Sequence, residues 1–120
     1  MRLQEIQERL DRLHASSPDI EGLALVNQEG FIIACVLPDG LDEESVASLT
    51  AAFQGMADRC ADELDKGRAV QTLLKTDRGS VVLTSAGPDA CLSVIAGPQV
   101  KPGMILLDAR QTAEELLELL

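Results

Sequence analysis

Two consecutive apolar segments, joined by a short polar loop, constrain the fold of this chain more than any other feature. Gly22–Val26 and Phe31–Leu37 are apolar at nearly every position, and Asn27–Gly30 connects them. Short apolar segments without alternation are typical of strands covered on both faces. Gly30 suits the left-handed conformation that a hairpin connection requires. The sequence therefore predicts a β-hairpin in the middle of a sheet, with other elements packed on both faces.

Three further segments have the periodicity of helices. The first has an apolar stripe with three- and four-residue spacing and ends at Ser16–Asp19; the stripe consists of Leu3, Ile6, Leu10 and Leu13. The second is long, from about Asp42 to Lys66, with Asp42 as its N-cap and Gly67 as the residue that follows its C-cap. The third begins near Pro102, a residue that suits the first turn of a helix.

Three more strands are expected between the second and third helices, at about Arg68–Thr76, Ser80–Ser85 and Ala90–Ala96. The first of these is the most polar strand of the chain. Val70, Thr72, Leu74 and Thr76 share one of its faces, and Gln71 and Lys75 lie on the other. This pattern indicates a sheet edge, and a long bare edge must be protected or paired.

The long helix has two informative faces. One carries large apolar residues and is expected to face the core: Val46, Leu49, Phe53, Met56, Cys60 and Leu64. The opposite face begins with small residues and ends with acidic ones: Ser48, Ala51, Gly55, Asp58 and Asp62. Gly55 in mid-helix costs roughly 1 kcal/mol relative to alanine. Close approach of another helix would compensate for that cost, and an ordinary exposed position is the alternative.

The length of 120 residues fits a single domain covering residues 1–120. Apolar residues form 46% of the chain, but Trp and Tyr are absent, so the core must be aliphatic. The order of the expected elements is α-β-β-α-β-β-β-α. The fold class is therefore α/β, in the α+β sense.

Twenty acidic residues against ten basic ones give a formal net charge of −10. This balance opposes binding to nucleic acids, which requires neutralisation of phosphates, and binding to anionic membranes. The acidity either keeps the protein soluble or matches a partner with a basic face. The charged N-terminus, the short apolar runs and three widely spaced cysteines predict a cytoplasmic protein.

No recognisable catalytic constellation occurs in the sequence. His14 is the only histidine, and no serine or cysteine is placed by a motif to act with it. The phosphate-binding loop, dinucleotide fingerprint and metal-ligand motifs are absent. Cys35, Cys60 and Cys91 lie in apolar segments, where cysteine usually behaves as a small apolar side chain. The sequence predicts no catalytic residue, no metal site and no cofactor, and it favours binding of another protein.

The order of elements and several short segments resemble the roadblock/dynein light-chain family, and within it the MglB-like proteins. The similar segments are Ile20–Val26 followed by Gly30, Leu49–Ala61, Gly79–Leu83, Ala90–Val94 and Ala113–Leu117. The resemblance covers almost the whole chain and depends on the order and spacing of these segments. It implies a five-stranded antiparallel sheet with the long helix on one face and the terminal helices on the other.

The resemblance also implies a homodimer in which the third strands pair edge to edge and the long helices lie side by side. The interface residues would be Val70, Thr72, Leu74, Thr76, Ala51 and Gly55. MglB-like proteins regulate small Ras-like GTPases, which implies a GTPase regulator or effector that is not itself an enzyme. The partner-binding face of the long helix would be Ser48, Ala51, Gly55, Asp58, Arg59 and Asp62, where Arg59 either contacts the partner or is a solvated charge near Asp58 or Asp62. A structural adaptor and a small-ligand sensor are the alternatives.

Overall fold

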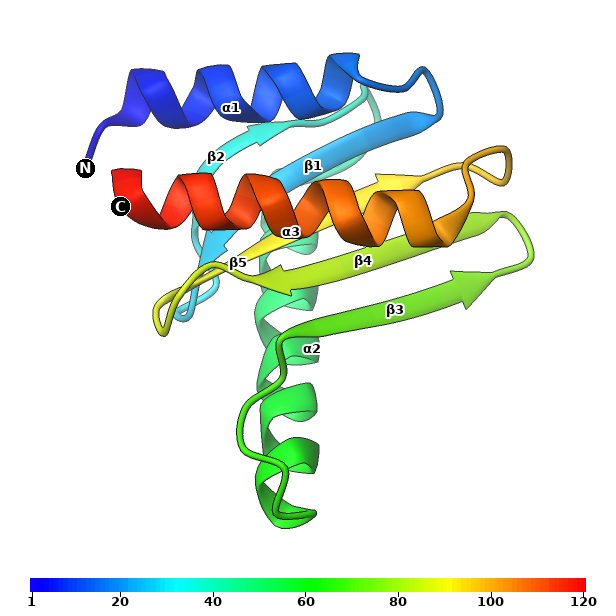
Figure 1. Cartoon of the computed structure of the whole chain (residues 1–120). Helices are drawn as coiled ribbons and strands as arrows, with labels where there is room; N and C mark the ends of the chain where they lie inside the picture. Colours follow the sequence, from blue (N-terminus) through cyan, green and yellow to red (C-terminus); the bar gives the residue numbers. More distant parts are fainter.

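Helices cover both faces of one antiparallel sheet in the computed structural model, which describes all residues 1–120 (Figure 1). The elements are α1 (Leu3–Ala15), β1 (Ile20–Asn27), β2 (Ile32–Val36), α2 (Glu43–Glu63), β3 (Gln71–Thr76), β4 (Gly79–Ser85), β5 (Ala90–Ala96) and α3 (Pro102–Leu119). The strands lie in the order β2-β1-β5-β4-β3. The predicted order of elements, the five-stranded sheet and the edge position of β3 are confirmed.

The predicted hairpin is present, but only β1 lies within the sheet. β1 pairs with both β2 and β5, whereas β2 is an edge strand, so its expected central position is wrong. Both strands are apolar because helices cover them from both sides. Ile33 and Val36 pack against the core beneath α1 and α3, while Ile32 and Cys35 pack against the core beneath α2. A continuous apolar segment indicates that both faces of a strand are covered, but it does not indicate a central position, because the edge strand β2 is also covered on both faces.

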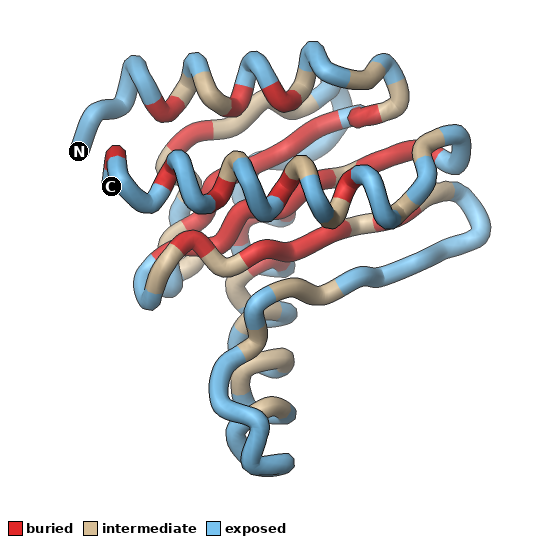
Figure 2. The backbone as a smooth tube through the Cα atoms, in the orientation of Figure 1, coloured by how far each residue is buried: buried red, intermediate tan, exposed pale blue.

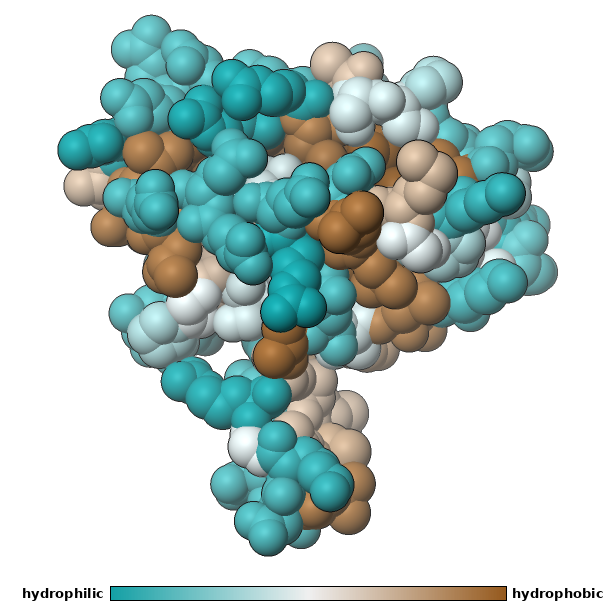
Figure 3. Space-filling view, viewed as in Figure 1, coloured by the Kyte–Doolittle hydropathy of each residue, from teal (hydrophilic) through white to brown (hydrophobic).

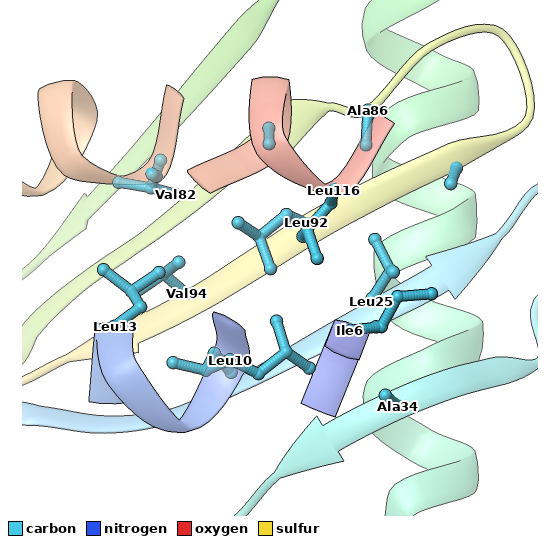
Figure 4. Packing of buried hydrophobic residues seen from close by; sticks show 14 of the residues in the cluster. Ile6, Leu10, Leu13, Leu25, Ala34, Val82, Ala86, Leu92, Val94 and Leu116 are labelled. Carbon is cyan, nitrogen blue, oxygen red and sulfur yellow. The ribbon is translucent and has the colours of Figure 1, made fainter. Parts of the chain in front are cut away.

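The main core lies between the sheet and the pair α1 and α3. It contains 18 buried residues, and Figure 4 shows side chains from both helices meeting those of the strands. Ile6, Leu10 and Leu13 of α1 are fully or almost fully buried, as the sequence predicts, while Leu3 is exposed. Ile105, Ala109, Ala113 and Leu116 form the buried stripe of α3. These two helices thus seal one face of the sheet.

The opposite face of the sheet is covered only by α2, and its core is small. The apolar cluster there has four buried residues, Ala24, Val26, Val46 and Ala47, against 18 in the cluster on the other side. The prediction that the large apolar residues of α2 face the core is therefore wrong for the single chain, except at Val46. Leu49, Phe53, Met56, Cys60 and Leu64 are exposed, and Val46, Ala47 and Thr50 are the buried residues of this helix. One helix leaves much of this sheet face without a cover.

The two ends of α2 are closed by local hydrogen bonds. Asp42 is the N-cap, as predicted, and its Oδ2 accepts a hydrogen bond from the backbone N–H of Ser45 at 3.2 Å. At the other end, the N–H of Lys66 donates to the carbonyl of Ala61 at 2.7 Å. This six-residue closure requires a left-handed residue at Asp65, whose φ is +59°. The turn that was expected at Gly67 therefore begins two residues earlier, at an aspartate.

Asp65→Gly is expected to raise the free energy of unfolding by about 0.5–1 kcal/mol, because glycine adopts the left-handed conformation without a steric penalty. The substitution also removes a negative charge from the negative end of the helix dipole. Urea unfolding at a fixed protein concentration measures the change. Lys66→Gly is the matched control, since Lys66 has no positive φ, and it should lower stability instead. Equal effects of both glycines would contradict this account.

Candidate protein-binding surface

The exposed side chains of α2 form a continuous apolar stripe along the helix. The α2 stripe consists of Leu49, Phe53, Met56, Cys60 and Leu64, at four- and three-residue spacing. Met56 is 74% exposed and Phe53 42% exposed. The C-terminal half of α2 extends past β3, and Figure 2 shows almost no buried residue along this half. Figure 3 shows apolar atoms along one flank of the protruding end. Contiguous exposed apolar surfaces of this kind commonly mark sites where a partner binds.

An apolar groove continues the α2 stripe onto the sheet. It has a volume of about 310 Å³ and lies between one flank of α2 and the strands β3, β4 and β5. Its lining is almost entirely apolar: Leu41, Val46, Leu49, Thr50, Phe53, Leu74, Val81, Leu83, Ser93 and Ile95. The groove and the stripe share Leu49 and Phe53, so they form one surface. The groove is the part of this sheet face that α2 leaves uncovered.

The edge of β3 presents unpaired backbone groups beside this surface. The N–H of Ser85 donates to the carbonyl of Val70 at 2.9 Å, which makes these two residues a hydrogen-bonded pair in the β3–β4 register. Hydrogen-bonded pairs alternate along an antiparallel ladder. Thr72, Leu74 and Thr76 therefore direct their backbone groups toward β4. The free N–H and C=O groups of the edge belong to Gln71, Leu73 and Lys75.

The expected interface residues of β3 lie on the groove side of the strand. Val70 and Leu74 are exposed, as is Thr76, whereas Thr72 is half-buried. The sequence predicted these four residues as the dimer interface, but it did not predict that the free backbone groups of the edge belong to the residues between them. The two-residue loop Asp77-Arg78 was the available signal, because the pair Thr76–Gly79 that closes such a hairpin is hydrogen-bonded.

The residues of the expected partner-binding face of α2 differ in their exposure to solvent. Ser48, Gly55, Arg59 and Asp62 are exposed, and a Cβ at Gly55 would meet no atom within 4 Å. Ala51 and Asp58 are half-buried and turned toward the rest of the chain. Asp58 Oδ1 accepts hydrogen bonds from the Ala69 N–H at 3.0 Å and from Gln54 Nε2 at 3.3 Å. These bonds tie the segment before β3 to α2.

Arg59 is exposed and forms an ion pair with Glu63, not with Asp58 or Asp62. Its Nε lies 3.4 Å from Glu63 Oε1, one helical turn further along α2. Both side chains are well exposed, so this pair contributes little to stability and constrains the guanidinium weakly. Arg59 is therefore free to change partner when another surface approaches.

The titratable groups do not assemble into a reactive cluster. No three Asp, Glu, His or Cys side chains are grouped in a way that could hold a metal ion. Burial raises the pKa of the Cys91 thiol to about 12, helped by the nearby negative charge of Asp58 and opposed by a hydrogen bond from the Thr84 backbone. Burial and a hydrogen bond to Glu43 raise the pKa of Cys35. Neither thiol has the low pKa of a nucleophile. None of the helices combines the length and apolar character needed to cross a membrane.

The sheet topology and the uncovered face beside α2 place this protein in the class of roadblock-like α+β modules. These modules have terminal helices on one sheet face and one long helix on the other. The protein belongs to the Roadblock/LC7 domain family, whose sequence pattern matches residues 6–96.

Known relatives support this assignment in sequence and in structure. The uncharacterized protein MJ1340 of Methanocaldococcus jannaschii is 31% identical over 97 residues, which cover 81% of this chain and 84% of that protein. MglB of Myxococcus xanthus has a similar structure, with a TM-score of 0.90, 22% identity and coverage of 98% of this chain and 88% of that one. A structure of MglB with a tetrameric arrangement gives a TM-score of 0.89 at 19% identity, covering 98% and 88%. At these identities the two structures show a shared fold.

Proposed function

We propose that this chain forms a two-fold symmetric homodimer through β3 and the α2 stripe, and that the dimer binds a small Ras-like GTPase. The observation that carries the proposal is the apolar surface made by the α2 stripe and the apolar groove, next to a bare strand edge. A self-complementary surface of this kind suits a two-fold interface. Pairing the edge also removes the aggregation hazard of an open strand.

The position of β3 relative to α2 supports one particular form of the proposed dimer. A two-fold axis perpendicular to the sheet at the β3 edge places both α2 helices on the same sheet face. The second α2 then runs antiparallel to the first, on the flank where the apolar groove lies. Each protruding helix end covers the open sheet face of the other copy. At 21 residues α2 is about 31 Å long, enough to reach across that face.

The alternation of inward- and outward-facing backbone groups along β3 limits the register in which β3 can pair with β3 of the second copy. Under this symmetry, opposed residues must point to the same sheet face, and the hydrogen-bonded pairs must use the outward-facing residues Gln71, Leu73 and Lys75. Centring the pair on Leu73 uses all three. Leu73 then opposes Leu73 of the second copy, and Gln71 opposes Lys75. A shift of two residues along either strand leaves one of the three without a partner.

A Leu73→Cys chain is therefore expected to form a disulfide-linked dimer under mild oxidation. Directly opposed residues of a hydrogen-bonded pair have Cα atoms about 5.5 Å apart, within the range of a disulfide. The exposed Cys60 is first replaced by serine, and non-reducing electrophoresis reports the cross-link. Lys75→Cys is the matched control, because its two copies would lie about four residues apart along the pair. Cross-linking at Lys75 but not at Leu73 would contradict this register.

The outer side of the paired α2 helices is the surface that we propose for the GTPase. It carries Ser48, Gly55, Arg59 and Asp62 of both copies, and such a set of exposed small and charged side chains suits another protein more than a small ligand. The family resemblance supports the GTPase as partner, since MglB-like proteins accelerate GTP hydrolysis by such a protein. The dimer would act by holding the switch regions of the GTPase so that its own residues reach the γ-phosphate.

Single-turnover GTP hydrolysis by a Ras-like GTPase from the same genome tests this function, together with binding to its GTP and GDP forms. Faster hydrolysis and tighter binding of the GTP form would establish activation, and state-dependent binding alone would establish an effector. Equal binding of both forms would favour the structural adaptor. Gly55→Arg should abolish binding while the dimer persists, because the new side chain projects into open space outside the fold. Absence of binding to every such GTPase would contradict the proposal.

A further inference from the structure

The turn between β1 and β2 presents an exposed aromatic ring in a fixed position. Phe31 is one of two phenylalanines in the chain and is 68% exposed. Asn27 holds the turn: its Oδ1 accepts hydrogen bonds from the N–H groups of Glu29 at 3.1 Å and Phe31 at 3.0 Å. Its own N–H donates to the Phe31 carbonyl at 2.9 Å. A side chain on a fixed backbone loses little freedom when it binds a partner.

Phe31 forms one wall of a pocket against the N-terminal half of α2. The pocket has a volume of about 520 Å³ and is lined by Gly30, Phe31, Ile32, Glu43, Glu44, Ala47 and Ser48. It shares no residue with the apolar groove, which lies on the other flank of α2. The pocket therefore remains open in the proposed dimer. We refer to it as the Phe31 pocket.

The charge around the Phe31 pocket is entirely negative. Glu43 and Glu44 line it, Glu29 lies in the turn, and no lysine or arginine contributes to its walls. None of these three carboxylates takes part in the four ion pairs of the chain. Glu43 accepts a hydrogen bond from the Cys35 thiol at 3.4 Å, which does not neutralise its charge. An apolar wall surrounded by uncompensated carboxylates complements an apolar side chain flanked by cations.

We propose that the Phe31 pocket docks a basic segment of a partner protein. An apolar side chain of that segment would pack on Phe31 and Ile32, and its lysine or arginine side chains would face Glu43, Glu44 and Glu29. An arginine could also stack on the ring. A second copy of this chain is a poor occupant, because it carries the same net charge of −10. The inference does not depend on whether the partner is a GTPase.

Selection from a library of random peptides displayed on phage tests this proposal on the full chain. The enriched sequences should combine an apolar residue with an excess of lysine and arginine. In fluorescence polarisation with the synthesised peptides, Phe31→Ala should weaken binding by about tenfold or more, as expected for an aromatic anchor. Leu107→Ala is the matched control, because Leu107 is similarly exposed but lies on α3, across the sheet, and it should leave binding unchanged.

The charge requirement is tested with the double variant Glu29→Gln/Glu44→Gln, which should bind the peptides more weakly and with a smaller dependence on salt concentration. Glu8→Gln/Glu118→Gln removes the same charge from the terminal helices and should have no effect. Failure to enrich any peptide would overturn the proposal. So would enriched peptides that lack basic residues, or peptides that bind the Phe31→Ala chain as well as the parent.

Discussion

A chain carrying Phe53→Asp is expected to be monomeric at concentrations where the parent chain is a dimer. Phe53 lies in the apolar groove and in the α2 stripe, where the second copy would exclude water. A carboxylate buried there without a partner costs several kcal/mol. At about 4 kcal/mol the dissociation constant would rise about a thousandfold. Sedimentation velocity over a concentration series measures the shift. The protomer itself should remain folded, because Phe53 is already 42% exposed in the single chain.

The other phenylalanine supplies the matched control for this experiment. Phe31→Asp introduces the same change on the opposite flank of α2, outside the proposed interface, and should leave the dimer intact. Dimers of equal strength in both variants would rule out the α2 stripe as the interface. Loss of the dimer in both variants would show that added negative charge alone opposes assembly.

The free energy of unfolding is expected to fall above pH 9 because of Cys91. The ordinary pKa of this thiol is 9.0, and burial raises it to about 12 in the folded chain. The folded state therefore keeps its proton while the unfolded state loses it. The contribution to stability is complete below pH 9 and is lost as the pH rises toward 12. The slope is about 1.4 kcal/mol per pH unit, or about 4 kcal/mol in total.

Comparison with Cys91→Ala isolates this effect from the other alkaline titrations. The variant should be about 1 kcal/mol less stable at pH 7, because it leaves a small cavity, but it should lack the Cys91 slope. When the free energy of unfolding from urea titrations is plotted against pH, the curve of Cys91→Ala should therefore cross that of the parent near pH 10. The chain has no tyrosine, which simplifies this pH range. Cys60→Ala is the control at a protein concentration that keeps the chain monomeric, since Cys60 is exposed in the single chain, and it should keep the parent slope. Parallel pH profiles of Cys91→Ala and the parent would contradict the raised pKa.

Much of this architecture follows from local patterns. The stripe of α1 predicts its buried face, Asp42 predicts the start of α2, and Pro102 that of α3. The polar alternation of Val70–Thr76 predicts an edge strand, and β3 is one. These signals are local, because helix caps, turns and periodicity depend on residues within a few positions of one another. They were sufficient for the element order and the fold class.

The orientation of α2 could not be read from its sequence. Both of its faces have features of a buried surface, one with large apolar residues and the other with small ones. The large face was expected to meet the chain's own sheet, yet of that face only Val46 is buried, together with Ala47 and Thr50. Apolar periodicity identifies a face that is removed from water, but it does not say whether the same chain or another removes it.

The sequence by itself determined the elements, their order and the edge character of β3, because each depends on short-range geometry and on burial of apolar side chains. Only the tertiary structure decided that β2 is also an edge strand, that Asp58 is bound to the Ala69 backbone, and which β3 residues present free backbone groups. Those features depend on which distant segments come into contact. The free backbone groups of β3, for example, follow from its ladder with β4. A one-residue change in that ladder would exchange the residues facing β4 for those facing the open edge.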